Sequence, residues 1–209
     1  MTSFFSEPPD VLLAEDDEDG LGLCPVWAGP PWHTRPGVVA MSVEIGRSAS
    51  TVVLLEGTRA YADGVVLRVV IHAREAGREA RRRLFAHLEL AHGRGMLDAR
   101  LRPGSLRWGV EFSDGHRVST LDESPWVNDP PDGVDFESWL PDHPVLEWLD
   151  RPTGAGGTWS REAWLWPHPP AGVLRVVCAW ADRDITETSV FIDVAPLREA
   201  AQRAKSILA

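Results

Sequence analysis

The chain has 209 residues, 44% of them hydrophobic and 25% charged, which provides enough apolar surface for the core of one folded domain. No apolar stretch reaches the roughly 18 residues that a membrane-spanning helix needs, and the start of the sequence does not resemble a signal peptide, so we expect a cytoplasmic protein without a membrane partner. The net charge of −10 argues against nucleic-acid binding, which depends on a basic face.

The composition of residues 1–24 predicts an acidic, disordered tail. The first 20 residues contain seven acidic side chains and no lysine or arginine. Such a segment buries too little apolar surface to offset the entropy that folding costs. We therefore expect a single folded domain over residues 25–209. It begins with PVWAGPPW, a segment whose prolines favour an extended chain.

Three runs of β-branched and apolar residues follow, at 38–45, 50–57 and 65–74. The first run alternates between apolar and polar residues, and the second is expected to end at Gly57. Short polar breaks separate the three runs, so they predict an antiparallel meander.

A helix is predicted over residues 78–92. Ala80, Leu84 and Leu88 are spaced by four residues, which places them on one face of a helix. We expect this apolar face to pack against a sheet, with the arginine-rich face toward solvent.

Residues 105–121 are typical of a β-hairpin. Apolar side chains alternate along its first strand, and Asp114-Gly115 is a turn dipeptide. Further along the chain, three strands are expected at 158–167, 172–181 and 186–195, and a final helix is expected at 196–208.

Residues 122–157 predict a long acidic loop. The segment is rich in proline and glycine, and it contains nine acidic residues and one arginine. Short helical turns are expected near 135–140 and 144–149. The segment also contains three tryptophans, which are unusual in a disordered loop: Trp126, Trp139 and Trp148.

Together these elements predict a mainly β protein. The expected fold is an antiparallel β-sandwich, immunoglobulin-like or similar, with one inserted helix and one C-terminal helix. Strands and helices do not alternate along the chain, so a parallel sheet is not expected. Trp108, Trp164 and Trp180 lie in predicted strands and are expected to be core residues.

Several motifs resemble a family of small uncharacterised proteins that is common in actinobacteria. They are WGVEFSDG at 108–115, WPHPPAGVL at 166–174 and WADRDITETSVFIDVAPLREAAQRA at 180–204. The resemblance covers most of the chain from about residue 25 and departs from the family's pattern at 122–157. It implies a shared fold and a cytoplasmic location, and it implies no known activity.

The sequence contains no recognisable catalytic, cofactor or metal motif, so we predict no enzyme activity, no cofactor and no metal. The seven histidines do not follow a zinc-binding pattern. The glycine-rich run at 154–157 does not precede a helix, as a phosphate-binding loop does. Cys24 and Cys178 are expected to be reduced thiols, although a bridge between them stays open on sequence grounds.

Two groups of side chains are candidates for an interaction surface. Arg78, Arg81 and Arg82 on the predicted helix would suit an acidic partner or a phosphate, or would form an ordinary solvated face that the chain's own acidic segments offset. The three loop tryptophans would suit carbohydrate stacking or a protein hot spot, or would pin the long loop to the body.

The function that the sequence favours is a non-enzymatic protein-binding or adaptor domain, with another protein as its partner. The alternative is a small-ligand binding protein, for a carbohydrate or a basic metabolite, that uses a loop lined by tryptophan and acidic residues. A third hypothesis, an enzyme with an unfamiliar site, would need titratable residues gathered in a cleft.

Overall fold

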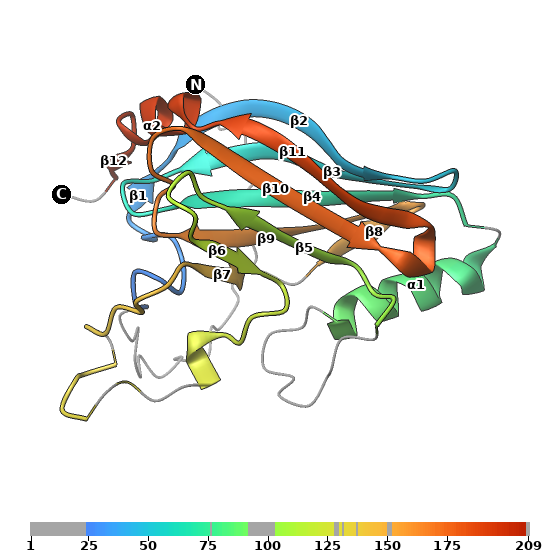
Figure 1. Cartoon of the computed structure of the whole chain (residues 1–209), viewed down its shortest axis with the longest axis horizontal. Coiled ribbons are helices and arrows are strands. Elements are labelled where there is room, and N and C mark those ends of the chain that lie inside the picture. Colours follow the sequence, from blue (N-terminus) through green and yellow to red (C-terminus); the bar gives the residue numbers. More distant parts are fainter. Residues whose placement is uncertain are drawn as a thin grey trace, which may run out of the picture.

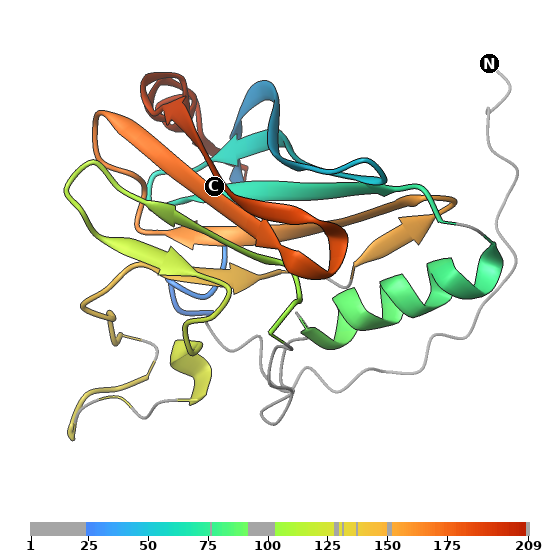
Figure 2. The ribbon, with the colours of Figure 1, turned by 45° about the vertical axis from the view of Figure 1, so that its right-hand side comes forward.

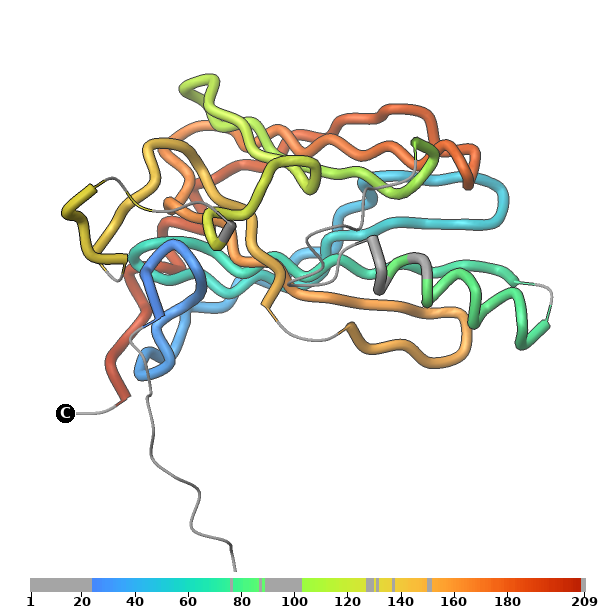
Figure 3. The backbone as a smooth tube through the Cα atoms, turned by 90° about the horizontal axis from the view of Figure 1, so that it is seen from below, coloured from blue at the N-terminus to red at the C-terminus, as the bar shows by residue number. Residues whose placement is uncertain are grey.

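The structure is a computed structural model that describes residues 24–75, 77–91, 103–127, 130, 132–136, 138–149 and 152–207. The predicted acidic tail lies outside these residues, except for Cys24. The described part is mainly β, with antiparallel sheets and two helices, so the prediction of a β-sandwich is confirmed. The two main sheets lie one in front of the other in Figure 1 and appear as two layers in Figure 3.

The larger sheet has six strands in the order β2, β3, β4, β9 and β7, with β8 also paired to β9. Strands β2 to β4 form the predicted meander. Strand β3 continues through Gly57, where we expected it to end, because this glycine has a φ of 57° and lies in a register shift between Leu55 and Thr58. The bounds are β2 (Gly37–Arg47), β3 (Thr51–Ala60), β4 (Val65–Ala73), β7 (Val145–Trp148), β8 (Thr153–Ala155) and β9 (Thr158–Trp166).

The smaller sheet has four strands in the order β11, β10, β5 and β6. Strands β5 and β6 are the predicted hairpin, in which the Phe112 N–H donates to the His116 carbonyl at 2.7 Å across the Asp114-Gly115 turn. The predicted neighbours at 158–167 and 172–181 belong to different sheets, so the Pro-rich segment between them joins the two layers. The bounds are β5 (Arg107–Glu111), β6 (Arg117–Ser119), β10 (Val173–Trp180) and β11 (Ile185–Asp193); a 3-10 turn, η2 (Ala181–Arg183), joins the last two.

Residues 122–157 are more regular than the predicted loop. They contain the 3-10 turn η1 (Pro125–Val127) and strands β7 and β8. The helical turn expected near 144–149 is wrong, because this segment is β7 and pairs with β9. The sequence of β7 does not show the usual alternation of apolar and polar residues, because Glu147 is an acidic residue at a buried position. Its carboxylate accepts a hydrogen bond from Ser124 there. Near 135–140 the Trp139 N–H donates to the Asp135 carbonyl at 2.9 Å, which closes a single turn.

The two helices are α1 (Arg78–Ala91) and α2 (Ala195–Ala201). Helix α1 follows the prediction as far as it is described, and it lies beside β8 at one side of the sandwich (Figures 1 and 2). Helix α2 was expected to reach residue 208, which is wrong: the chain turns after Ala201 and then pairs as β12 (Lys205–Ser206) with β1 (Thr34–Arg35). Within the described residues, no helix has the length and apolar character to cross a membrane.

The main core lies between the two sheets. Trp108, Trp180 and the apolar face of α1 are buried there, as expected. Trp164 is also buried, but on the opposite face of the larger sheet, where its Nε1–H donates to the Val26 carbonyl at 3.0 Å. At one edge the two sheets are tied together, because the Thr188 hydroxyl of β11 donates to the carbonyl of Ile45 in β2 at 2.6 Å.

The two cysteines lie in different environments. Cys24 is exposed, Cys178 is buried in the main core, and no disulfide joins them. Burial raises the pKa of the Cys178 thiol to about 12. At about pH 8, Cys178 is therefore almost entirely protonated, and the thiolate form, which is the one that reacts with electrophiles, is nearly absent.

We expect a thiol reagent to modify Cys24 in the native protein and to leave Cys178 unmodified. In concentrated guanidinium chloride both should react, because unfolding exposes Cys178 and removes the cause of its raised pKa. Intact-mass spectrometry counts the modified thiols, and a Cys178→Ala variant identifies the protected one. Native modification of Cys178 at the rate of Cys24 would contradict its burial.

Candidate functional site

Two of the predicted loop tryptophans, Trp126 and Trp139, come together with Trp27 and Phe136. We call these four residues the aromatic cluster. The Trp27 ring centroid lies 5.1 Å from that of Trp126 and 5.8 Å from that of Trp139, and the Trp27 Nε1–H donates to the Trp139 carbonyl at 2.9 Å. The rings pack against one another, which is the geometry of a packing anchor.

The aromatic cluster fixes the N-terminal Pro-rich segment over the larger sheet. Trp27 is 0% exposed and packs with Val145 of β7, and the hydrogen bond from Trp164 to Val26 joins the same segment to β9. Trp126 keeps 43% of its surface exposed. The geometry therefore supports pinning of the loop more than a carbohydrate site.

The third loop tryptophan, Trp148, lies elsewhere. It is half-buried against the main core, with ring centroids 5.8 Å from Trp108 and 6.3 Å from Trp159. The guanidinium of Arg161 stacks 5.0 Å from the Trp148 ring centroid. Trp148 thus does not share a surface with the aromatic cluster.

The predicted basic face lies on α1. Arg78 and Arg82 are exposed, and Arg81 is half-buried. The neighbouring Arg83 forms an ion pair with Glu79 at 3.6 Å, a contact between two exposed groups that contributes little to stability. The six predicted interaction residues therefore occupy three separate places rather than one site.

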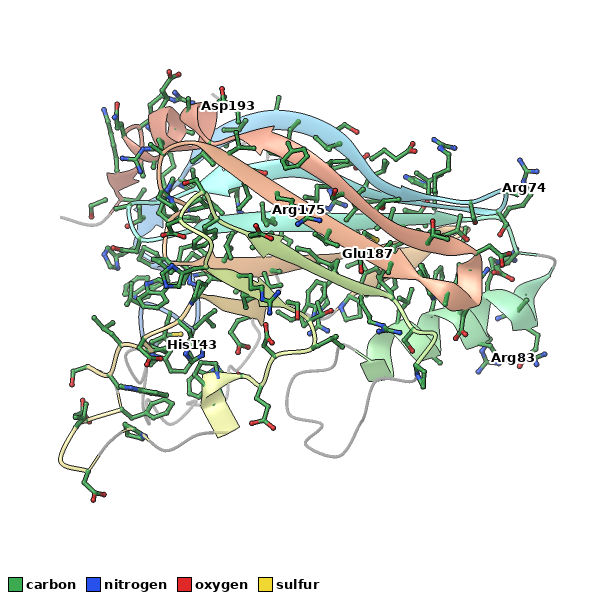
Figure 4. The ribbon with its side chains drawn as sticks, viewed as in Figure 1. Arg74, Arg83, His143, Arg175, Glu187 and Asp193 are labelled. Atoms are coloured by element: carbon green, nitrogen blue, oxygen red, sulfur yellow. The ribbon has the colours of Figure 1, made fainter. Side chains whose placement is uncertain are left out.

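A groove on the outer face of the smaller sheet is the strongest candidate for a functional site. It has a volume of about 930 Å³, and the face of the smaller sheet on which it lies is turned toward the viewer in Figure 4. Neither described helix covers this face in Figures 1 and 2. The residues that line it come from four strands and two loops: Arg107, Trp108, Gly109, Val110 and Glu111 of β5, Arg117, Val118 and Ser119 of β6, Arg175, Val177 and Ala179 of β10, Glu187 of β11, Leu121, Asp122 and Glu123 after β6, and His143 and Pro144 before β7.

The floor of the groove is a row of small side chains. Val177 lies opposite Gly109 in the β10–β5 register, and Gly109 lies opposite Ser119 in the β5–β6 register. A Cβ atom on Gly109 would lie 2.5 Å from the Val118 carbonyl oxygen, so a larger residue there would displace β6. Because Gly109 has no side chain, it leaves space in the groove and allows β6 to pair closely with β5.

One end of the groove carries a row of charged side chains across three strands. Arg175, Glu111 and Arg117 occupy paired positions of β10, β5 and β6. Arg175 forms an ion pair with Glu111 at 3.2 Å, and Arg117 provides a second guanidinium on the other side of that carboxylate in the register. The row therefore has a net positive charge.

The other end of the groove is acidic. Glu187 of β11 lies on one side of Arg107, and Asp122 and Glu123, which follow β6, lie on the other side. The Arg107 guanidinium donates to the Pro103 carbonyl. Asp122 accepts the backbone N–H of Ser119 at 2.6 Å and so caps the outer edge of β6. Figure 4 shows Arg175 and Glu187 at separate positions along the smaller sheet.

His143 completes the wall of the groove beside β6. Its Nδ1 lies 2.9 Å from Asp142 Oδ1, and the hydrogen bond from His143 holds the pKa of the Asp142 carboxyl below its usual range. Both groups are exposed, so this pair acts as a solvated contact at the rim.

Among the described residues, no group of three or more His, Cys, Asp and Glu side chains is placed to hold a metal ion. No family model, curated protein or solved structure matches the chain. The assignment of a site therefore rests on the geometry of the molecule.

The groove could not be predicted from the sequence. Its residues come mainly from two strand pairs that are distant in the chain, β5–β6 and β10–β11, and the β10–β5 register brings these pairs together. One local signal was present: Arg107, Gly109 and Glu111 alternate with buried apolar residues, which marks the outward face of β5.

Removing the Trp27 side chain should test the anchor role of the aromatic cluster. We expect Trp27→Ala to lower the free energy of unfolding by about 3–5 kcal/mol, as for other large buried aromatic residues. Trp32→Ala is the matched control, because Trp32 lies in the same Pro-rich segment but is 71% exposed, and it should change stability by less than about 0.5 kcal/mol.

Urea denaturation followed by far-UV circular dichroism measures both changes. If Trp27→Ala is too unstable to purify, Trp27→Phe should give a smaller loss in the same direction. Equal stability of the Trp27 and Trp32 variants would refute the anchor role.

Proposed function

We propose that this protein is a non-enzymatic binding domain that docks another protein in the groove on the smaller sheet. The observation that carries the proposal is the open outer face of this sheet, with a small, partly apolar floor between charged rows. The outer face of the larger sheet differs, because the aromatic cluster and the Pro-rich segment already cover part of it.

The composition of the groove supports a protein partner. Val177, Ala179 and Leu121 offer apolar surface, and Leu121 is 54% exposed. Charged side chains of both signs surround them, which is the pattern of an apolar centre with a polar rim found in protein interfaces. The two charged ends would contribute to the choice of partner and to the rate of association.

We also propose that the protein acts in the cytoplasm. Support comes from Cys24 and Cys178, which no disulfide joins, as is usual for proteins of a reducing compartment. The resemblance to actinobacterial proteins of unknown activity remains a hypothesis about its relatives.

Filling the groove should abolish partner binding. Val177→Trp places a large side chain on the outward-facing floor without changing the core. Val173→Trp is the matched control, because Val173 lies on the same strand and faces the same side, is already 47% exposed, and is not among the residues that line the groove.

The test is affinity capture from a lysate of the source cells with three immobilised proteins, followed by quantitative mass spectrometry. A partner retained by the wild type and by Val173→Trp, and reduced at least about tenfold by Val177→Trp, would support docking in the groove. Equal capture by all three proteins would place the binding surface elsewhere. Unfolding curves must show that both variants are folded.

A further inference from the structure

The groove is electrically polarised along the direction of its strands. Arg175 belongs to the basic row, and Ala179, four residues further along β10, lies beside Arg107 at the acidic end. At about 3.3 Å per residue, the two ends are separated by about 13 Å. Val177 lies midway between them, on the same face of the strand.

An extended peptide matches these positions. In an extended chain, side chains at positions i, i+2 and i+4 point to the same side, and positions i and i+4 are about 13 Å apart. The spacing of the groove is therefore the spacing of charges four residues apart. A small or apolar side chain at the middle position would face Gly109 and Val177.

On the basis of the proposed function, we propose that the groove binds an extended segment of its partner that carries one acidic and one basic residue four positions apart. The acidic side chain faces Arg175, and the basic side chain faces Glu187, which lies on β11 beside Ala179. A small or apolar residue between them contacts the floor.

The segment lies over the sheet instead of extending it. Strand addition at the edge of β6 would use the outward N–H of Ser119, but the Asp122 carboxylate already accepts this hydrogen bond. Recognition therefore depends on side chains, and the charges at the two ends set the spacing of the peptide.

A second copy of the chain fits this groove less well. A symmetric dimer would place the concave face of one copy against the concave face of the other, which leaves the floor without contacts. The groove volume of about 930 Å³ is instead large enough to hold a few side chains of one extended segment.

The probes for the test are fluorescein-labelled seven-residue peptides of glycine and serine with defined residues at positions two, four and six. The matched peptide has glutamate, valine and lysine at these positions. Three control peptides carry two glutamates, two lysines, or the glutamate and lysine only three positions apart. Fluorescence anisotropy at low salt measures their affinity for the full chain.

We expect the matched peptide to bind about fivefold more tightly than each control, since each charged contact at an exposed site contributes modestly. Binding should be lost in Val177→Trp and kept in Val173→Trp. Reversing the charge at the acidic end with Glu187→Lys should shift the preference to the peptide with two glutamates. A structural effect of the substitutions would weaken all peptides equally.

The outcomes separate this inference from the proposed function. Equal binding of all peptides, or no peptide binding while Val177→Trp still abolishes capture of a protein partner, would overturn the inference and leave the groove as a docking site. If Val177→Trp still bound the matched peptide and still captured the partner, both this inference and the proposed function would be overturned. A wild-type dimer in sedimentation velocity that Val177→Trp converts to a monomer would replace the peptide with a second copy of the chain.

Discussion

The antiparallel register between β5 and β10 determines both faces of the smaller sheet. Trp108 lies opposite Cys178, and both are buried in the main core. One position along, Gly109 lies opposite Val177, and both face outward. Because side chains alternate along a strand, a shift by one residue would move the tryptophan to solvent and fill the groove floor with core residues. The packing of the core thus also fixes the geometry of the candidate binding face.

The two sheets use their outer faces differently. The larger sheet carries the buried residues Trp164 and Tyr61 on its outer face, which need a cover. The Pro-rich segment provides a cover through Val26, whose carbonyl accepts from Trp164, and the candidate loop residues Trp126 and Trp139 pack beside it on Trp27. The groove on the smaller sheet carries charged and small residues, which are stable in water without a cover, and two exposed apolar side chains, Phe191 and Val173, lie on the same face. The difference in side-chain chemistry explains why the open face is the one with the groove.

Local patterns predicted the elements whose signals are local. The β5–β6 hairpin, the β2–β4 meander and the start of α1 follow from alternation, turn residues and four-residue spacing. Strand β7 could not be predicted, because Glu147 breaks the apolar pattern of the sequence although it is buried, where its carboxylate accepts a hydrogen bond from Ser124. The end of α2 at Ala201 could not be predicted either. Residues 205–206 pair with residues 34–35, which are distant in the chain, and this pairing competes with local helix propensity.

The candidate site was less predictable than the fold. The tryptophans and arginines are numerous in the sequence, and the structure distributes the candidate residues among them over the aromatic cluster, the core and α1. The groove residues are ordinary by type, and their significance comes from alignment across strands that lie more than 60 residues apart in the chain, such as Glu111 and Arg175. A single sequence contains no direct signal for such a pairing.

Two hydrogen bonds at strand edges affect how the protein behaves at high concentration. One joins Thr188 to Ile45, and the other joins Ser119 to Asp122. β proteins join into ordered aggregates at exposed strand edges, because the unpaired backbone N–H and C=O groups there can form hydrogen bonds with any extended chain. Here the first contact occupies an acceptor on β2, and the second occupies a donor on β6. These two contacts therefore remove one pairing position on each of the two edges, while the outer face of the smaller sheet stays open.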